Sequence, residues 1–371
     1  MRTTIPRSLY INILILIAAI GLAACNAQGS IPVDPLTATA ASINTAVPPA
    51  PTSLPPTASL LPTLPPIPSE TPLPTPTWTL EPYAGLSIGE MSARSYGGGE
   101  LVVEEVLADN TYFTRYLISY PSDGLKIYGF MNIPKRGSPP YPVVIALHGY
   151  IDPGIYDTLD YTTRYADALA RAGYIVLHPN LRGYPPSDGG DDLFRIGMAV
   201  DALNLIALVK SKGGLAGPLN LADPLAIGLW GHSMGGGIST RVITVSQDVK
   251  AAVLYGAMSG DERKNFERIF SYFSNGTRGI DELSAPQAVI ERVSPINFLD
   301  RVSAAVSIHH GANDPDVPSE WSSDLCNRLR SLAKDVECYF YAEQAHTFRG
   351  EDDQLFNLRT VQFFDRVLKN H

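Results

Sequence analysis

A chain of 371 residues, 45% of them apolar, is long enough to form one large domain with a sizeable core. Its formal net charge is −9 and its pI is near 5.3. This acidic balance argues against nucleic acid as a partner and against a polybasic contact with a membrane.

The start of the chain predicts export. Arg2 and Arg7 precede an apolar run from Leu9 to Ala24, which is shorter than a membrane-spanning helix needs. The run ends in Leu-Ala-Ala-Cys, which resembles the lipobox of bacterial lipoproteins. That resemblance implies that residues 1–24 are a signal peptide, that Cys25 carries a lipid, and that the protein is anchored to the membrane outside the cytoplasm. An ordinary secreted protein or an N-terminal anchor are the alternatives.

A tether is expected at residues 25–83. Fifteen prolines fall between Pro32 and Pro82, and few residues there are charged or able to build a core. Such a composition favours an extended, polyproline-like chain. The folded domain is therefore expected at residues 84–371.

From about residue 101, apolar β-rich runs alternate with helix-like runs. Strands are expected at residues 114–134, where two of them flank a Ser-Asp-Gly turn, and at residues 141–150, 174–180, 225–230, 251–258, 304–311 and 336–343. Helices are expected at residues 161–173, 192–212 and 354–370. The alternation predicts an α/β fold with a mostly parallel central sheet covered by helices on both faces.

One segment, about residues 259–297, interrupts this alternation and is called the cap segment below. Phe266, Ile269, Phe270 and Phe273 recur at helical spacing and are expected to share one face. We expect a small helical cap over the edge of the sheet. Ordinary packing helices are the alternative.

The most informative motif is Gly-His-Ser-Met-Gly at residues 231–235. An apolar strand is expected to end at Trp230, and a helix is expected to start after Met234. A serine on such a sharp strand-to-helix turn is exposed for attack on a carbonyl carbon. Ser233 is therefore the predicted nucleophile, and a glycine-rich turn with an incidental serine is the alternative.

A serine hydroxyl needs a base and a group that orients the base. In this setting the expected order along the chain is serine, acid, histidine. His346 follows the last expected strand and is the predicted base, and Asp314 follows the strand before it and is the predicted acid. Asp316 lies in the same loop and is interpreted as shaping it. The carboxylate would hold the imidazole in the correct tautomer.

An oxyanion hole is expected from two backbone N–H groups, those of Met234 and Tyr150. The Tyr150 hydroxyl could also contribute, and His148 is interpreted as bracing the same loop. This chemistry requires no metal or organic cofactor.

Two cysteines remain besides Cys25. Cys326 and Cys338 lie on a helix-like and a strand-like run, and outside the cytoplasm such a pair can oxidise to a disulfide. Two unpaired thiols are the alternative. Their spacing does not match a zinc site.

These motifs together resemble the α/β-hydrolase superfamily, and within it the prolyl-oligopeptidase (S9-type) and dienelactone-hydrolase-like branch. The resemblance covers about Leu101 to the C-terminus and depends on the segments PVVIALHGY, GHSMGGG, HGANDPDVP and AEQAHTF. It implies Ser233, Asp314 and His346 as the catalytic residues. One departure is Asn-Leu-Arg-Gly-Tyr-Pro-Pro-Ser at residues 180–187, where the family usually has Asp-x-Arg-Gly-x-Gly-x-Ser. Another is the proline-rich tether, which stands where prolyl oligopeptidases carry a β-propeller.

The sequence thus predicts an exported serine hydrolase that cleaves ester or peptide bonds through an acyl-enzyme. An S9-like peptidase and a carboxylesterase for small or carbohydrate-linked esters are both compatible with it. A peptidase would need a site for the free amino group, for which Glu262 and Glu267 are weak candidates. Arg182 is interpreted as tying down backbone carbonyls. A non-catalytic binding protein with this fold is the remaining alternative.

Overall fold

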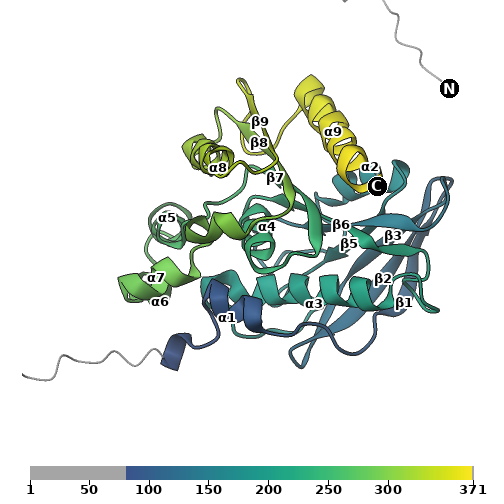
Figure 1. Cartoon of the computed structure of the whole chain (residues 1–371), viewed down its shortest axis with the longest axis horizontal. Helices are drawn as coiled ribbons and strands as arrows, with labels where there is room; N and C mark the ends of the chain where they lie inside the picture. Colours follow the sequence, from purple (N-terminus) through teal and green to yellow (C-terminus); the bar gives the residue numbers. More distant parts are fainter. Residues whose placement is uncertain (1–80, 370–371) are drawn as a thin grey trace, which may run out of the picture. The chain divides into compact units, whose positions relative to one another are not determined.

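A computed structural model describes residues 81–369 (Figure 1). The predicted signal peptide, the lipidation site Cys25 and nearly all of the predicted tether lie outside these residues. Within the described part, no helix has the length and apolar character that crossing a bilayer would require.

A nine-stranded sheet, counted over the described residues, organises the domain with the strand order β1-β2-β3-β5-β4-β6-β7-β8-β9. The strands are Val102–Asp109 (β1), Phe113–Ser122 (β2), Leu125–Pro134 (β3), Tyr141–Leu147 (β4), Ile175–Pro179 (β5), Ala222–His232 (β6), Val249–Tyr255 (β7), Ala305–Gly311 (β8) and Val336–Tyr341 (β9). Strands β1 to β3 pair antiparallel, β3 also pairs antiparallel with β5, and β4 to β9 form a parallel block. The predicted α/β architecture is confirmed.

Helices flank this sheet along the chain (Figure 1). The α-helices are Ile88–Ala93 (α1), Thr163–Arg171 (α2), Ile196–Lys212 (α3), Met234–Val245 (α4), Glu262–Arg268 (α5), Ile280–Leu283 (α6), Gln287–Val293 (α7), Ser319–Ser331 (α8) and Gly350–Phe364 (α9). Shorter 3-10 turns are Glu81–Tyr83 (η1), Leu193–Arg195 (η2) and Pro295–Arg301 (η4), and π-helical turns are Ile269–Phe273 (η3) and Asp365–Lys369 (η5).

The sheet separates two apolar cores. Along β4, Val143 and Ile145 contribute to one core, and Val144 contributes to the other, because successive side chains of a strand point to opposite faces. Buried residues of α3, α4 and α8 line the first core, and those of α2 and α9 line the second. A strand buried on both faces must be apolar throughout, which explains the continuous apolar runs of the parallel block.

The cap segment is helical, as expected, but its aromatic residues do not share one face. Phe266 is buried at 5% exposure, whereas Phe270 and Phe273 are 37% and 39% exposed. Helix α5 ends at Arg268, and the chain widens into the π-helical turn η3. A π-helical turn advances by more residues than an α-helical one, so the two phenylalanines rotate away from the face that holds Phe266.

The sequence reading also missed β1. Most side chains of β1 are exposed to solvent, so its sequence shows no alternation of apolar and polar residues. On the other edge of the sheet, a disulfide joins Cys326 of α8 to Cys338 of β9. This bond ties the helix to the last strand, directly before the loop that carries His346.

Candidate active site

Ser233 lies on a tight turn between β6 and α4. Its backbone has φ 54° and ψ −116°, a left-handed conformation that is uncommon for a residue with a side chain. A Cβ at Gly235 would lie 2.1 Å from the Leu147 carbonyl oxygen, and one at Gly231 would lie 2.4 Å from the Gly235 carbonyl oxygen. The two glycines of the motif are therefore required by close backbone contacts.

Neighbouring strands hold this turn in place. The Ser233 N–H donates to the Tyr255 carbonyl oxygen at 2.9 Å, and the Ser233 carbonyl oxygen accepts from the Met258 N–H at 3.0 Å. Strand β7, which ends at Tyr255, thus fixes the backbone of Ser233 at the carboxyl edge of the parallel sheet. The strain of the turn is offset by these contacts.

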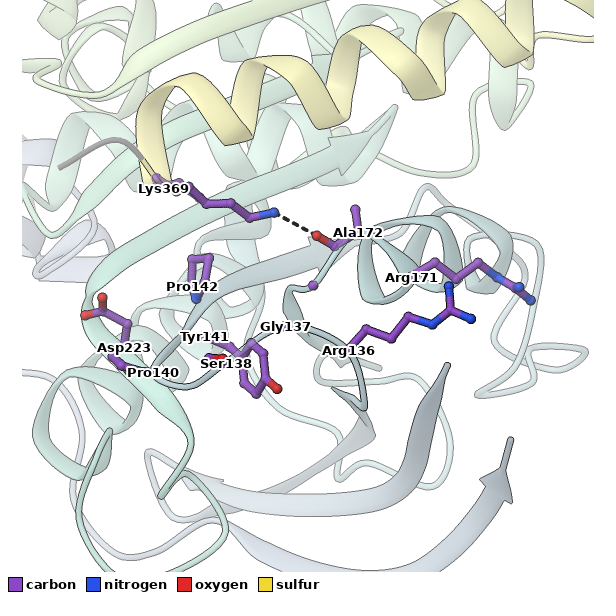
Figure 2. Close-up of a pocket in the computed structure, with 12 residues that line it drawn as sticks. Arg136, Gly137, Ser138, Pro140, Tyr141, Pro142, Arg171, Ala172, Asp223 and Lys369 are labelled. Carbon is purple, nitrogen blue, oxygen red and sulfur yellow. Dashed lines mark hydrogen bonds between the residues drawn. The ribbon is translucent and has the colours of Figure 1, made fainter. Parts of the chain in front are cut away.

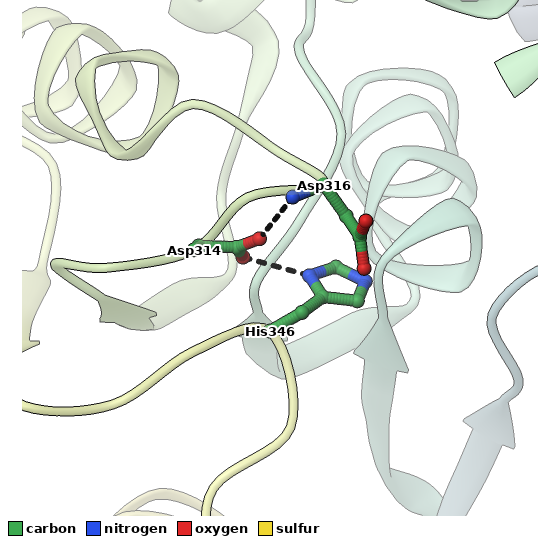
Figure 3. A group of neighbouring side chains, drawn as sticks. All are labelled: Asp314, Asp316 and His346. Carbon is green, nitrogen blue, oxygen red and sulfur yellow. Dashed lines mark hydrogen bonds and ion pairs between the residues drawn. The ribbon is translucent and has the colours of Figure 1, made fainter. Parts of the chain in front are cut away.

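Asp314 and His346 form a hydrogen-bonded pair. Asp314 follows β8 in the acid loop (residues 312–318), and its Oδ2 lies 2.7 Å from Nδ1 of His346 (Figure 3). The Asp314 side chain is fully buried, and that of His346 is 16% exposed. An Nδ1–H that donates to this carboxylate leaves Nε2 as the atom that can accept a proton.

The Asp314 carboxylate is saturated with donors. Its Oδ2 also lies 3.1 Å from Nε2 of His310, and its Oδ1 accepts from the N–H groups of Asp316 and Val317, both at 2.9 Å. Burial alone favours the protonated acid, but the hydrogen bonds from His310 and His346 prevail and hold the pKa of Asp314 well below its usual range. Asp314 is therefore ionised at neutral pH and can hold the imidazole of His346 in one orientation.

The loop of His346 lies directly against the turn of Ser233. A Cβ at Gly256 would lie 3.3 Å from Nδ1 of His346 and 3.5 Å from Oδ2 of Asp314, and Gly256 directly follows the residue that accepts the Ser233 N–H. The ring of His232, the residue before Ser233, lies 4.6 Å from the His346 ring between centroids. These contacts bring the three predicted residues to one edge of the sheet.

A chain of hydrogen bonds that the sequence reading missed links the loops around Ser233. The Gly149 N–H donates to the Tyr161 hydroxyl at 3.0 Å, and that hydroxyl lies 2.6 Å from Nδ1 of His232. On its other side, Nε2 of His232 donates to the His346 carbonyl oxygen at 3.0 Å. Burial lowers the pKa of His232 to about 3, so His232 is a neutral link between the loops.

The two residues predicted to form the oxyanion hole lie next to Ser233, one along the chain and one on a neighbouring loop. Met234 is the first residue of α4, so its N–H has no partner within the helix. A Cβ at Gly149 would lie 3.1 Å from the Ser233 Cβ, which places the loop that continues into Tyr150 against the serine. The Tyr150 ring is 48% exposed and lies 4.6 Å below the guanidinium of Arg278. Its side chain is therefore half-exposed and contacts the cap segment through Arg278.

His148 braces the start of this loop. Its Nδ1 lies 2.7 Å from the Gly149 carbonyl oxygen, and its Nε2 lies 2.8 Å from the Asn180 carbonyl oxygen. The interpretation of Arg182 needs correction. One Nη reaches the Asp191 carbonyl, but its main partner is the buried carboxylate of Asp201 at 2.8 Å, so Arg182 mainly balances a charge.

Glu262 is not available for a substrate. Its side chain is 4% exposed, and its carboxylate pairs with Arg195 and Arg241, each at 2.6 Å. It also accepts from the Asn265 amide at 3.0 Å. The prediction that Glu262 could bind the amino group of a substrate is therefore wrong, because its carboxylate is paired with two buried guanidinium groups. Glu267, on the same helix, is exposed.

Asp314, Asp316 and His346 are also the residues whose donor atoms could approach a cation, since one donor atom of each lies within 4.8 Å of the others. Asp314, however, already accepts hydrogen bonds through both oxygens. A cation would have to replace its contacts with His310 and His346. The donor set suits an acid–base pair better than a three-ligand metal site.

A separate hollow of about 440 Å³ lies beside the start of β4. Arg136, Arg171 and Lys369 are among the residues that line it (Figure 2). Nζ of Lys369 donates to the Ala172 carbonyl oxygen there at 2.7 Å. The start of β4 is the amino end of a parallel strand, whereas Ser233 lies at a carboxyl end. This hollow holds none of the predicted catalytic residues.

Proteins named as peptidases are among the relatives of this chain. Residues 215–371 match the model of the prolyl oligopeptidase family. Uncharacterized peptidase YtmA of Bacillus subtilis is 25% identical over 277 residues, 69% of this chain and 93% of that protein. Dipeptidyl aminopeptidase BIII of Pseudoxanthomonas mexicana is 23% identical over 269 residues, 66% of this chain but 37% of that protein.

Solved structures share the fold at low identity. An acylaminoacyl peptidase of Pyrococcus horikoshii superposes with a TM-score of 0.57 and 24% identity, over 70% of this chain and 43% of that one. Acetyl xylan esterase 1 from Thermoanaerobacterium superposes with a TM-score of 0.55 and 17% identity, over 77% and 92% of the two chains. The chain thus has the α/β-hydrolase fold, and the family match together with these relatives supports a serine hydrolase, either a peptidase or an esterase.

Proposed function

We propose that Ser233, His346 and Asp314 form the catalytic triad of an enzyme that hydrolyses ester or amide bonds. The observation that carries this proposal is the 2.7 Å contact between His346 and a buried, ionised Asp314, next to a serine in a left-handed turn. Such a pair can accept a proton from a hydroxyl at Nε2.

The reaction proceeds through an acyl-enzyme. Ser233 Oγ attacks the carbonyl carbon while its proton passes to Nε2 of His346. The N–H groups of Met234 and Tyr150 hold the developing oxyanion. The imidazolium then gives its proton to the leaving alcohol or amine, and water, deprotonated by the same imidazole, releases the acid product.

Labelling with a fluorophosphonate probe tests the nucleophile. The wild-type protein and Ser331→Ala, which removes an exposed serine from α8, are expected to react, and Ser233→Ala is expected not to react. Absence of labelling in the wild type would instead favour the non-catalytic binding protein. Labelling that persists in Ser233→Ala would reject this nucleophile.

Of the two substrate classes, we favour esters. An aminopeptidase-like activity would need an acidic group for the substrate's ammonium. Glu262 is paired with Arg195 and Arg241, which leaves the exposed Glu267 as the remaining, weak candidate. A panel of short-chain p-nitrophenyl esters, acetylated sugars, aminoacyl anilides and prolyl anilides separates the classes, with Ser233→Ala as the control. Anilide turnover at rates comparable to those of the esters would favour an S9-like peptidase.

We also propose that the enzyme is exported and lipid-anchored through Cys25. The apolar segment before Cys25 supports this proposal, and so does the disulfide between Cys326 and Cys338, since structural disulfides are rare in the cytoplasm. Cells fed a radiolabelled fatty acid should label the wild type but not Cys25→Ser. Equal labelling of both proteins would reject the anchor.

A further inference from the structure

A second carboxylate lies beside His346, on the side opposite Asp314. Figure 3 shows the Asp316 carboxylate next to the Nε2 edge of the ring, while Asp314 contacts Nδ1. One carboxylate oxygen of Asp316 lies within 4.8 Å of a ring nitrogen of His346. The imidazole is thus flanked by two acidic side chains from one short loop.

The loop backbone fixes Asp316 in this position. Its N–H donates to Oδ1 of Asp314 at 2.9 Å, and its carbonyl oxygen accepts from Nε of Arg268 at 3.0 Å. Arg268 also donates to the Pro315 carbonyl oxygen. The guanidinium of Arg268 is therefore engaged with backbone carbonyls, and within residues 81–369 no cation forms a salt bridge with the Asp316 side chain.

Four other ionisable groups near His346 make contacts of their own. Asp314 accepts from the ring itself and from His310, on β8. His232, on β6, contacts the ring but is held neutral by burial. Arg268, on α5, keeps its positive charge while it donates to neutral carbonyl oxygens. Of the two carboxylates beside the ring, Asp314 is paired with His310 and His346, whereas Asp316 forms no salt bridge within residues 81–369.

The protonation state of His346 decides what Asp316 does. The neutral ring, with its proton on Nδ1, presents a lone pair at Nε2 to the carboxylate, which is unfavourable. The imidazolium presents an N–H, which is favourable. An opposite charge at this distance stabilises the charged form, and partial exposure to water reduces the effect.

We propose that Asp316 is a positioning residue that acts through His346, holding the imidazolium and so moving the onset of activity to higher pH. This inference rests on the proposed role of His346 as the base. Removing the Asp316 charge should free the neutral imidazole at lower pH. We expect the acid limb of kcat/KM in Asp316→Asn to move down by about 0.5–1 pH unit.

The test compares pH profiles of kcat/KM for the wild type, Asp316→Asn, Asp316→Ser and Asp316→Glu. The Asn and Ser variants should be about three- to ten-fold more active than the wild type well below the midpoint, and Glu should keep the wild-type profile. Glu320→Gln, which removes an exposed charge from α8, is the matched control and should not shift. In 1 M NaCl the difference in pH midpoint between the wild type and Asp316→Asn should shrink.

A second readout does not depend on turnover. In a Ser233→Ala background, the His346 ring signals are titrated by NMR with and without Asp316→Asn, and the midpoint should fall by the same amount. An unchanged midpoint in both measurements overturns the role of Asp316. Undiminished hydrolysis by Ser233→Ala overturns the proposed function instead, so the two failures are distinguishable.

Discussion

Replacing Glu262 by Gln should weaken the folded state more than any substitution of an exposed acidic residue. Its carboxylate lies between Arg195 and Arg241, whose side chains are 10% and 1% exposed. A glutamine keeps the shape but leaves two buried cations without a counter-charge. Breaking a buried ion pair from one side costs about 3–5 kcal/mol of unfolding free energy, and for a domain of this size the melting temperature should fall by about 5–8 °C.

Urea denaturation followed by circular dichroism measures this change, with the slope of the transition expected to stay constant. Glu267→Gln, an exposed position on the same helix, is the control and should change the free energy by less than about 0.5 kcal/mol. A loss below about 1 kcal/mol for Glu262→Gln would refute the reasoning. So would an unchanged melting temperature combined with a raised KM confined to substrates with a free amino group, because this would show that Glu262 binds the substrate.

Three further changes have expected outcomes. Replacing Cys326 and Cys338 by Ser opens a loop with a sequence separation of 12 and should lower the free energy of unfolding by about 3 kcal/mol in urea titrations. Gly235→Ala should abolish soluble expression, because the new methyl would lie 2.1 Å from the Leu147 carbonyl oxygen. Asp314→Asn should be less stable than the wild type at pH 7. The urea midpoints should begin to converge as the pH falls below about 4 and should meet only below the lowered pKa of Asp314, since such a carboxylate stabilises the fold only while it is ionised.

Each of these has its own check. The cysteine variants should match the reduced wild type, and a wild type that is unaffected by reductant would contradict the first expectation. Gly189→Ala, where a Cβ would meet no atom within 4 Å, should express normally. A stability gap for Asp314→Asn that does not shrink at all as the pH falls below about 4 would show that lost packing, rather than charge, destabilises that variant.

The sequence was sufficient for the parts that follow from local pattern. Apolar β-rich runs predicted the parallel strands because a strand covered on both faces has no polar side. Gly231 and Gly235 predicted the turn at Ser233 because close backbone approach excludes a side chain. Chain order then selected Asp314 and His346, whose side chains the structure places in contact.

Other features depend on contacts between distant segments. Tyr161 and His232 connect two loops through one hydroxyl, and neither residue has a sequence pattern that marks this role. The burial of Glu262 depends on Arg195 and Arg241, which come from segments before and after the Ser233 turn. The π-helical turn after Arg268 changes which aromatic residues face the core, and periodicity read from the sequence assumes a constant helix.

Arg268 connects the cap segment to the loop of Asp314, the proposed catalytic acid. It leaves the end of α5 and binds the carbonyl oxygens of Pro315 and Asp316, within two residues of Asp314. Sequence changes in the cap that alter substrate choice would therefore also affect the position of Asp314. Substrate selectivity and turnover should then be difficult to alter separately, whether by evolution or by design.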